Sequence, residues 1–225
     1  MSNRYTEIHY NEALRPYTGY PVKLCNHLAD QYFGRRDGKL LDLCCGRGEH
    51  MGIFNDIGFE TYGIDRENVG QERGLNVSIA DVEKDPFPFD DNFFDSVMMK
   101  SAIEHIANTG HLLQEIHRVM KPGANVVITT CDWKKLYKIF YDDFTHVSPF
   151  TRASLQDAMR MFKFKEVVVE HFYHLPFTWK GGIRYHLPKL IGLVPVWYSQ
   201  TSEMTELRKL IRFSKEVQLL AFATK

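Results

Sequence analysis

The segment between Lys39 and Asp65 constrains the fold of this chain more than any other. An apolar run over 40–43 leads directly into a turn with Gly46 and Gly48, and a helix-like segment and a second apolar run follow, ending at Asp65. A strand, a glycine turn, a helix and a strand that ends in a carboxylate form one βαβ unit. Glycines let backbone N–H groups approach a ligand closely, and the positive end of the helix faces the turn. The segment therefore predicts a binding site.

The ligand is predicted to carry a nucleoside, because an acidic residue at the position of Asp65 can hydrogen-bond both hydroxyls of a ribose. A dinucleotide fingerprint needs a third glycine at position 51, where this chain has Met51. A phosphate-binding Gly-Lys-Ser/Thr turn is also absent from the sequence. An NAD-dependent oxidoreductase is therefore a weakened alternative.

The remaining pattern, Asp42-x-x-x-Gly46-x-Gly48 with Asp65 downstream, resembles the class I S-adenosylmethionine-dependent methyltransferases. Cys44 stands where the first motif of that family usually has glycine. The resemblance implies an α/β fold with a Rossmann-like sheet of seven strands, mostly parallel with the last strand antiparallel, between two layers of helices. It implies S-adenosylmethionine as cofactor, held by Asp42, Cys44, Gly46, Gly48, Asp65, Arg66, Asp81, Val82, Met99 and Lys100. We further expect the two glycines to serve backbone approach to the cofactor rather than folding.

The rest of the chain supplies the other elements of such a fold. Hydrophobic periodicity and turn residues predict helices over 22–32, 112–120 and 203–213 and a helix capped by Thr151, and strands over 75–80, 93–99, 125–130, 164–172 and 216–224. The segments around the fourth and fifth strands also resemble the family. We predict one domain over 1–225, with an N-terminal cover over 1–37 and insertions over 131–150 and 174–214. One tyrosine of the cover, Tyr5, Tyr10, Tyr17 or Tyr20, is expected to touch ligand.

The amino-acid composition limits which classes of partner and which kinds of site are expected. Basic and acidic side chains balance at 28 each, so no net charge favours nucleic acid. The four cysteines have no C-x-x-C spacing, which argues against a zinc site or a disulfide framework. The chain shows no signal peptide and no apolar run long enough to span a membrane. We therefore expect a cytoplasmic protein.

Methyl transfer to a hydroxyl needs a base that takes the proton as the new bond forms, and histidine suits this role at neutral pH. His105 follows the fourth strand, where the family places acceptors beside the methyl group. His146 lies next to Asp142 and Asp143, either of which could orient its ring. We expect one of the two histidines to be catalytic and favour His146, since His105 has only Glu104 beside it.

A divalent metal bound by Glu104, His105 and His146 is an alternative interpretation of the same residues. Small-RNA 2′-O-methyltransferases and ubiquinone-pathway O-methyltransferases are similar here, with Glu-x-x-Glu-His after the fourth strand. In this chain Ser101 replaces the first Glu and removes a ligand. Hard cations usually take more oxygen ligands than remain, so we predict no metal.

The predicted function is O-methylation of a small molecule or of a sugar or glycolipid acceptor. The run over 142–151 resembles that of bacterial methyltransferases associated with surface-polysaccharide or glycolipid assembly. N-methylation and a non-catalytic module that binds S-adenosylmethionine are the alternatives. The aromatic and basic insertion over 174–214 is expected to form an acceptor-pocket wall, with a homodimer contact second and a lipid contact third.

Overall fold

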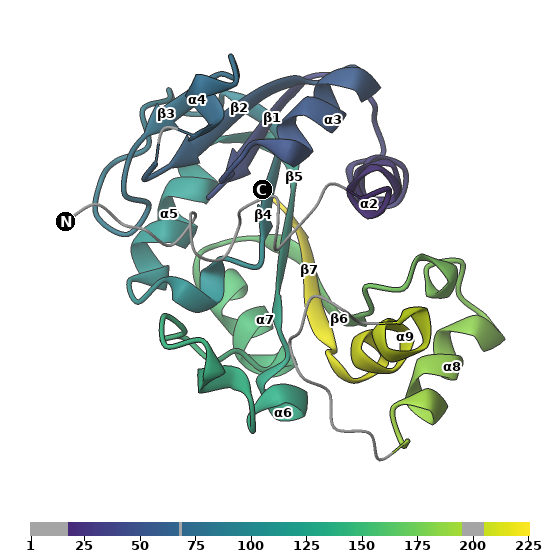
Figure 1. Ribbon diagram of the computed structural model, residues 1–225. Helices are drawn as coiled ribbons and strands as arrows, with labels where there is room; N and C mark the ends of the chain where they lie inside the picture. The colour runs from purple at the N-terminus through teal and green to yellow at the C-terminus, as the bar shows by residue number, and fades with distance from the viewer. Residues whose placement is uncertain (1–17, 68, 195–204) are drawn as a thin grey trace.

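Figure 1 shows the computed structural model of the chain, which describes residues 18–67, 69–194 and 205–225. Its centre is a seven-stranded sheet with the order β3-β2-β1-β4-β5-β7-β6. The strands are β1 (Lys39–Leu43), β2 (Glu60–Asp65), β3 (Val77–Ile79), β4 (Phe94–Lys100), β5 (Met120–Cys131), β6 (Lys165–Phe172) and β7 (Gln218–Thr224).

The pairing of the strands confirms the predicted topology. Parallel ladders join β3, β2, β1, β4 and β5, whereas β7 runs antiparallel between β5 and β6. The strand order reverses between β1 and β4, which is the place where open α/β sheets bind ligands beyond the carboxyl ends of their strands. Because β6 is antiparallel to β7, it ends at the same edge of the sheet as β5.

Helices cover both faces of the sheet (Figure 1). They are α2 (Tyr20–Leu28), continued by a π-helical turn (Ala29–Phe33), α3 (Glu49–Ile57), α4 (Val69–Glu72), α5 (Thr109–Val119), α6 (Trp133–Leu136), α7 (Arg152–Met161), α8 (Ile183–Ile191) and α9 (Glu206–Lys215). Short 3₁₀ turns lie at Ile103–His105, Phe140–Asp142 and Pro176–Thr178.

The core consists of two hydrophobic layers that follow the alternation of the strands. Leu41 of β1 faces the layer that contains Ile116 of α5 and Met159 of α7. Leu40, its neighbour on β1, faces the opposite layer with Leu28 of α2. Successive strand residues point to opposite faces, so these central strands are buried on both sides and read as continuous apolar runs.

Several boundaries differ from the sequence-based expectations. The third strand is confined to 77–79, because Leu75 instead packs in a small cluster with Met51 and Val77. β5 begins at Met120, earlier than expected, and pairs irregularly with β4 at this end. The predicted cap at Thr151 is confirmed, and Ser154 completes a capping box with it. Glu203, the expected start of the last helix, lies outside the described residues, and α9 begins after Thr205.

Within the described ranges, no helix is both long enough and apolar enough to cross a bilayer.

Candidate active site

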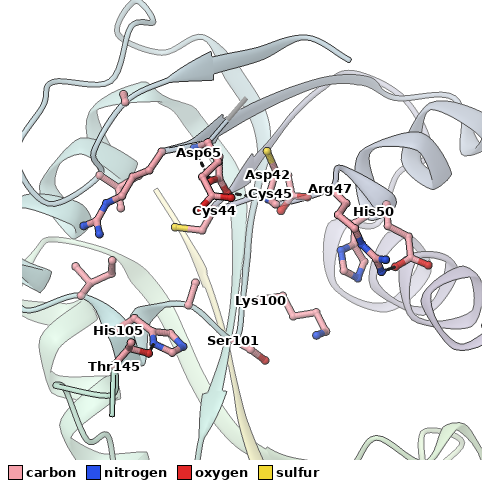
Figure 2. Close-up of a pocket in the computed structure, with 18 residues that line it drawn as sticks. Asp42, Cys44, Cys45, Arg47, His50, Asp65, Lys100, Ser101, His105 and Thr145 are labelled. Atoms are coloured by element: carbon pink, nitrogen blue, oxygen red, sulfur yellow. Dashed lines mark hydrogen bonds and ion pairs between the residues drawn. The ribbon is translucent and has the colours of Figure 1, made fainter. Parts of the chain in front are cut away.

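A cavity of about 270 Å³ opens at the carboxyl ends of β1, β2 and β4, where the strand order reverses. Figure 2 shows Asp42, Asp65 and the glycine turn along one wall and Ser101, His105 and Thr145 on the opposite side, with Lys100 between them. The lining residues are Asp42, Cys44, Cys45, Gly46, Arg47, Glu49, His50, Asp65, Arg66, Glu67, Ala80, Val82, Lys100, Ser101, Ala102, His105, Ile106 and Thr145.

The glycine turn is held in a left-handed conformation at three positions. The φ angle is 57° at Cys44, 52° at Gly46 and 71° at Gly48. A residue other than glycine is strained in this region, which explains why the resembling family prefers glycine at the position of Cys44. The N–H of Cys44 donates to the carbonyl of Ile64 at 2.8 Å and so ties the turn to β2.

The two glycines have different surroundings. A Cβ atom at Gly46 would meet no atom within 4 Å, and this residue lines the cavity. A Cβ atom at Gly48 would lie 2.1 Å from Cδ1 of Leu75, and Gly48 is not among the lining residues. A Cβ atom at Gly48 would thus meet the Leu75 side chain beneath the turn, and the expectation that both glycines serve ligand approach rather than folding stays a prediction.

Asp65 lies at the end of β2, as expected, and lines the cavity. Its Oδ2 accepts the N–H of Gly46 at 2.8 Å, and its Oδ1 accepts the N–H of Glu67 at 3.0 Å. The carboxylate thus fixes the glycine turn. Each carboxylate oxygen has a second acceptor position, which leaves capacity for the hydroxyls of a ligand.

Asp42 is buried at the floor of the cavity, and its Oδ2 has no hydrogen-bond partner in the described part of the chain. Burial, together with the negative charge of Asp65, raises the pKa of Asp42 to about 8, although the charge of Lys100 opposes the shift. A cationic ligand would favour the ionised carboxylate. S-adenosylmethionine carries a sulfonium and an ammonium group, so this donor set fits it.

Arg66, Asp81 and Val82, three of the residues expected to hold the cofactor, differ in their position relative to the cavity. Arg66 and Val82 line the cavity, whereas Asp81 lies outside its wall. One guanidinium nitrogen of Arg66 lies 2.9 Å from Asp81 and 2.8 Å from Glu83. The carboxylate of Asp81 is therefore paired with Arg66. It also accepts a hydrogen bond from the backbone N–H of Glu83, which closes a turn.

Met99 and Lys100 also behave differently from each other. Met99 is fully buried in the hydrophobic layer, whereas Lys100 lines the cavity. The charge of Lys100 reaches His50 at the start of α3, and burial together with this charge lowers the pKa of His50 to about 3. His50 Nε2 is buried without a hydrogen-bond partner in the described residues and lines the cavity. Sequence reasoning missed His50, although its place directly after the glycine turn was a usable signal.

His105 lines the cavity, and it has a polar neighbour other than the expected Glu104. Its Nδ1 lies 2.8 Å from Oγ1 of Thr145. The Thr145 hydroxyl donates to Oδ1 of Asp143 at 2.6 Å, so its only proton is used there. The Nδ1–H of His105 therefore donates to Thr145, and Nε2 is left as the basic atom. Thr145 was not predicted, because it becomes a neighbour of His105 only through the fold of the first insertion.

His146 lies next to His105 and is not among the residues that line the cavity. The two ring centroids are 4.6 Å apart. Its Nδ1 lies 2.5 Å from the carbonyl oxygen of Phe140, so a backbone carbonyl orients this ring, in place of the expected carboxylate of Asp142 or Asp143.

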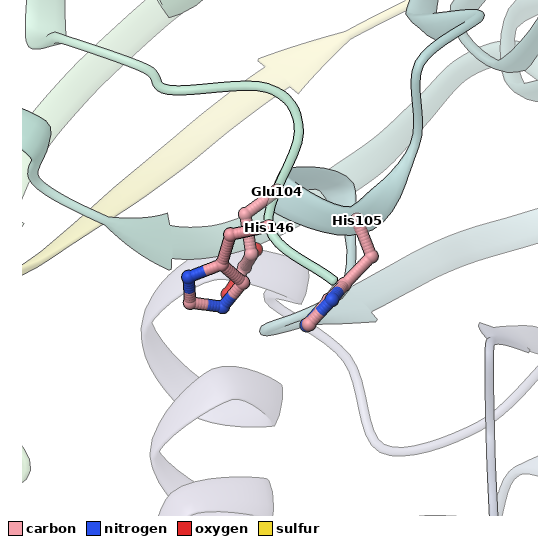
Figure 3. Close-up of side chains that lie close together, drawn as sticks. All are labelled: Glu104, His105 and His146. Atoms are coloured by element: carbon pink, nitrogen blue, oxygen red, sulfur yellow. The ribbon is translucent and has the colours of Figure 1, made fainter. Parts of the chain in front are cut away.

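Figure 3 shows Glu104, His105 and His146 side by side, with one potential ligand atom from each within 4.8 Å of the others. Glu104 is buried, and burial raises the pKa of its carboxyl. Its Oε2 accepts the hydroxyl of Thr130 at 2.8 Å. The structure thus brings together the three residues of the alternative hypothesis of a metal site. The absence of a metal stays a prediction.

The described parts of the N-terminal cover and of the second insertion do not line the cavity. Tyr5, Tyr10 and Tyr17 lie outside the described residues. Tyr20 does not line the cavity and instead bonds His174 Nδ1 through its hydroxyl at 2.6 Å. No described residue of the 174–214 insertion lines the cavity, so this part of the insertion is not a wall of it.

Comparison with known proteins identifies the family. Residues 17–169 match the family described as methyltransferase domain. The 2-phytyl-1,4-naphtoquinone methyltransferase of Nostoc punctiforme is 36% identical over 101 residues, which cover 39% of this chain and 44% of that protein. The ubiquinone/menaquinone biosynthesis C-methyltransferase of Neisseria meningitidis is 29% identical over 117 residues, covering 46% of each chain. The chain thus spans less than half the length of these curated relatives.

The fold has close structural counterparts. A methyltransferase structure from Archaeoglobus fulgidus, described as dependent on S-adenosylmethionine, aligns with a TM-score of 0.69 and 24% identity over 99% of this chain and 100% of that chain. The likeness confirms the predicted fold, and the family match confirms the predicted cofactor and enzyme class. The chain therefore belongs to the methyltransferase domain family, the class I methyltransferases that use S-adenosylmethionine.

Proposed function

We propose that this chain transfers the methyl group of S-adenosylmethionine to a hydroxyl group of an amphiphilic acceptor, with His105 as general base. The observation that supports this proposal is the position of His105 on the cavity wall, with Nδ1 bonded to Thr145 at 2.8 Å and Nε2 therefore basic. His146, which is favoured on sequence grounds, is the weaker candidate for the base because it is not among the residues that line the cavity.

The residues divide the work between binding and proton transfer. Gly46, Asp42 and Asp65 would hold the cofactor, which supplies an electrophilic methyl group when bound. The acceptor hydroxyl would lie beside His105, and Nε2 would take its proton as the new carbon–oxygen bond forms and the carbon–sulfur bond breaks. The electron pair of the broken bond remains on sulfur. The chain contributes positioning and exclusion of water, which dominate in-line displacements of this kind.

Two observations bear on the acceptor. The two relatives described above have quinones in their names. The run over 142–151 resembles that of bacterial methyltransferases associated with surface-polysaccharide or glycolipid assembly. A quinone and a glycolipid both join a polar reactive end to an apolar remainder, and this shared chemistry supports an amphiphilic acceptor. Methylation of a ring carbon is the second candidate, because the relative from Neisseria meningitidis is named a C-methyltransferase. A base at His105 serves this reaction as well, by removing the proton of a phenolic hydroxyl.

The test combines discovery of the acceptor with one substitution. Lipid and aqueous extracts of a bacterial lysate are incubated with the protein and methyl-labelled S-adenosylmethionine, and labelled products are identified by mass spectrometry and NMR. We expect a methyl ether in the lipid extract. His105→Ala should lower turnover by about 10²–10⁴-fold while cofactor binding by calorimetry is retained.

Other results would refute parts of the proposal. A labelled carbon–methyl bond favours the second candidate, and a labelled amine favours N-methylation. Binding of the cofactor without any labelled product in either extract supports a non-catalytic module. A His105→Ala variant within about threefold of wild type would exclude His105 as the base.

A further inference from the structure

Helix α8 presents its apolar residues to solvent. Ile183 is 80% exposed, Leu190 is 65% exposed, and Leu187 is also exposed. At about 100° per residue these three positions fall within one narrow stripe of the helix. A surface helix normally turns such a stripe toward the core, so α8 has the opposite orientation.

The other side of α8 is what fastens it to the protein. Pro188 is buried, and Tyr185 packs against a cluster with Tyr173, Leu175 and Val217. The Tyr185 hydroxyl also donates to the carbonyl of His171. The helix is therefore anchored through its inner face, and its outward apolar stripe is a fixed feature of the surface.

Positive charge surrounds the stripe. Lys180, Arg184 and Lys189 lie on or next to α8, and the sequence has no acidic residue between Glu170 and Glu203. The chain as a whole has a formal net charge of zero, so this local excess is compensated elsewhere. An apolar stripe flanked by lysine and arginine matches a surface of anionic headgroups over hydrocarbon.

The position of α8 relates it to the cavity. β6 ends at the same edge of the sheet as β4 and β5, and the segment with α8 follows β6 directly. In Figure 1, α8 and α9 lie together beyond this end of β6. Helix α8 therefore lies toward the edge of the sheet at which the cavity opens, although none of its residues lines the cavity.

We propose that the outward stripe of α8 docks the protein on the surface of an anionic lipid bilayer. The nine-residue helix would lie in the plane of the interface, with Ile183, Leu187 and Leu190 among the acyl chains and the basic residues against the headgroups. This proposal gives a lipid contact a higher rank than the sequence analysis does, because the local positive charge does not appear in the overall net charge. The inference does not depend on the proposed reaction.

Flotation of the full chain with lipid vesicles tests the proposal. We expect binding to vesicles of phosphatidylcholine mixed with phosphatidylglycerol, and weaker binding to phosphatidylcholine alone. Leu190→Glu should reduce the binding constant by about tenfold or more. Met161→Glu is the control, because Met161 on α7 is even more exposed than Leu190, at 79%, and it should leave binding unchanged. Replacing Arg184 and Lys189 by Gln should cost about fivefold for each charge on anionic vesicles.

Three outcomes would overturn the proposal. The first is absence of the wild-type protein from the vesicle fraction. The second is an equal loss with Met161→Glu, which would indicate non-specific adsorption. The third is a dimer in sedimentation equilibrium that Leu190→Glu dissociates, because the stripe would then be an interface between two copies of the chain. Thermal unfolding of both variants verifies that they fold, and flotation requires no methyl acceptor, so failure here is distinct from failure of the proposed reaction.

Discussion

The Nδ1 atom of His105 lies 2.8 Å from the hydroxyl oxygen of Thr145, although 40 residues separate them in the sequence. The Thr145 hydroxyl in turn donates to Asp143, so a carboxylate acts on the imidazole through one intervening hydroxyl. This arrangement holds the tautomer of His105 in which Nδ1 carries the proton and Nε2 is the basic atom. Thr145 is thus a positioning residue for the proposed base.

Replacing Thr145 separates positioning from packing. Thr145→Val keeps the volume but removes the hydroxyl, so we expect turnover to fall by about tenfold or more as the tautomer of His105 is no longer fixed. Thr145→Ser keeps the hydroxyl and should restore most of the activity. The measurements are turnover against pH and cofactor affinity for both variants, and the affinity should not change. Equal activity of the Val and Ser variants would show that the hydroxyl has no part in catalysis.

The sequence predicted the frame of the site because that frame is local. The turn at Gly46, the strand end at Asp65 and the apolar runs of the strands are each determined within a short window, and the sheet order followed from the family resemblance. The two-sided core also follows from the alternation of neighbouring residues such as Leu40 and Leu41.

Two of the relationships that sequence reasoning missed join distant segments. Thr145 meets His105 only because the first insertion folds back over the end of β4, where Val147 donates its N–H to the carbonyl of Glu104 at 2.9 Å. The surroundings of Gly48 could not be predicted either, since they depend on Leu75. No local pattern indicates which residue fills such a contact.

The cluster of Glu104, His105 and His146 makes the metal question testable. We expect chelation by EDTA to leave turnover unchanged. Of the three side chains only the carboxylate offers oxygen ligands, which hard cations prefer, and His105 is needed as a base. Calorimetry with Zn²⁺ and Mg²⁺ provides the measurement. Stoichiometric binding that Glu104→Gln abolishes, together with loss of activity after chelation, would contradict this expectation. Gln is the conservative choice, since it can still accept the hydroxyl of Thr130.

Asp42 should couple cofactor binding to pH. Its pKa of about 8 in the folded chain lies above its usual value of 3.8, so the folded state holds a proton that the unfolded state releases between these values. The contribution of Asp42 to stability is therefore complete below 3.8 and is lost as pH rises toward 8. A cationic ligand favours the ionised carboxylate, so affinity for S-adenosylmethionine should rise as the pH approaches 8 from below.

The matched variant for this prediction is Asp42→Asn, which cannot ionise. We expect its affinity to be lower and its pH dependence to be flatter than that of wild type. Titration of the cofactor itself contributes equally to both proteins and cancels in the comparison. Parallel pH profiles for the two proteins would show that Asp42 does not ionise when the cofactor binds.

Gly46 and Gly48 should respond differently to the same substitution. Both have positive φ, so alanine strains either position by about 1–2 kcal/mol. Gly46→Ala adds a methyl group in the cavity and should weaken cofactor binding more than it lowers the melting temperature. Gly48→Ala adds a clash with Leu75 and should lower the melting temperature further. A larger melting-temperature loss for Gly46→Ala would contradict the assignment.

Asp65 has a structural role in the glycine turn in addition to its predicted role at the ribose, and one variant cannot separate them. Asp65→Ala should weaken cofactor binding by roughly 2–4 kcal/mol, but loss of the bonds to Gly46 and Glu67 would contribute to that figure. The two roles differ in how they respond to a change in the ligand.

The affinities of wild type and Asp65→Ala for adenosine and for 2′,3′-dideoxyadenosine form a thermodynamic cycle that isolates the contact with the ribose hydroxyls. If Asp65 accepts hydrogen bonds from both hydroxyls, wild type should prefer adenosine by about tenfold or more, and Asp65→Ala should lose most of that preference. A preference of the same size in both proteins would leave Asp65 only the task of holding the turn. Loosening of the turn weakens both ligands alike, so it changes the two affinities without changing their ratio. The ratio is therefore the quantity that decides whether the carboxylate at the end of β2 binds the ribose.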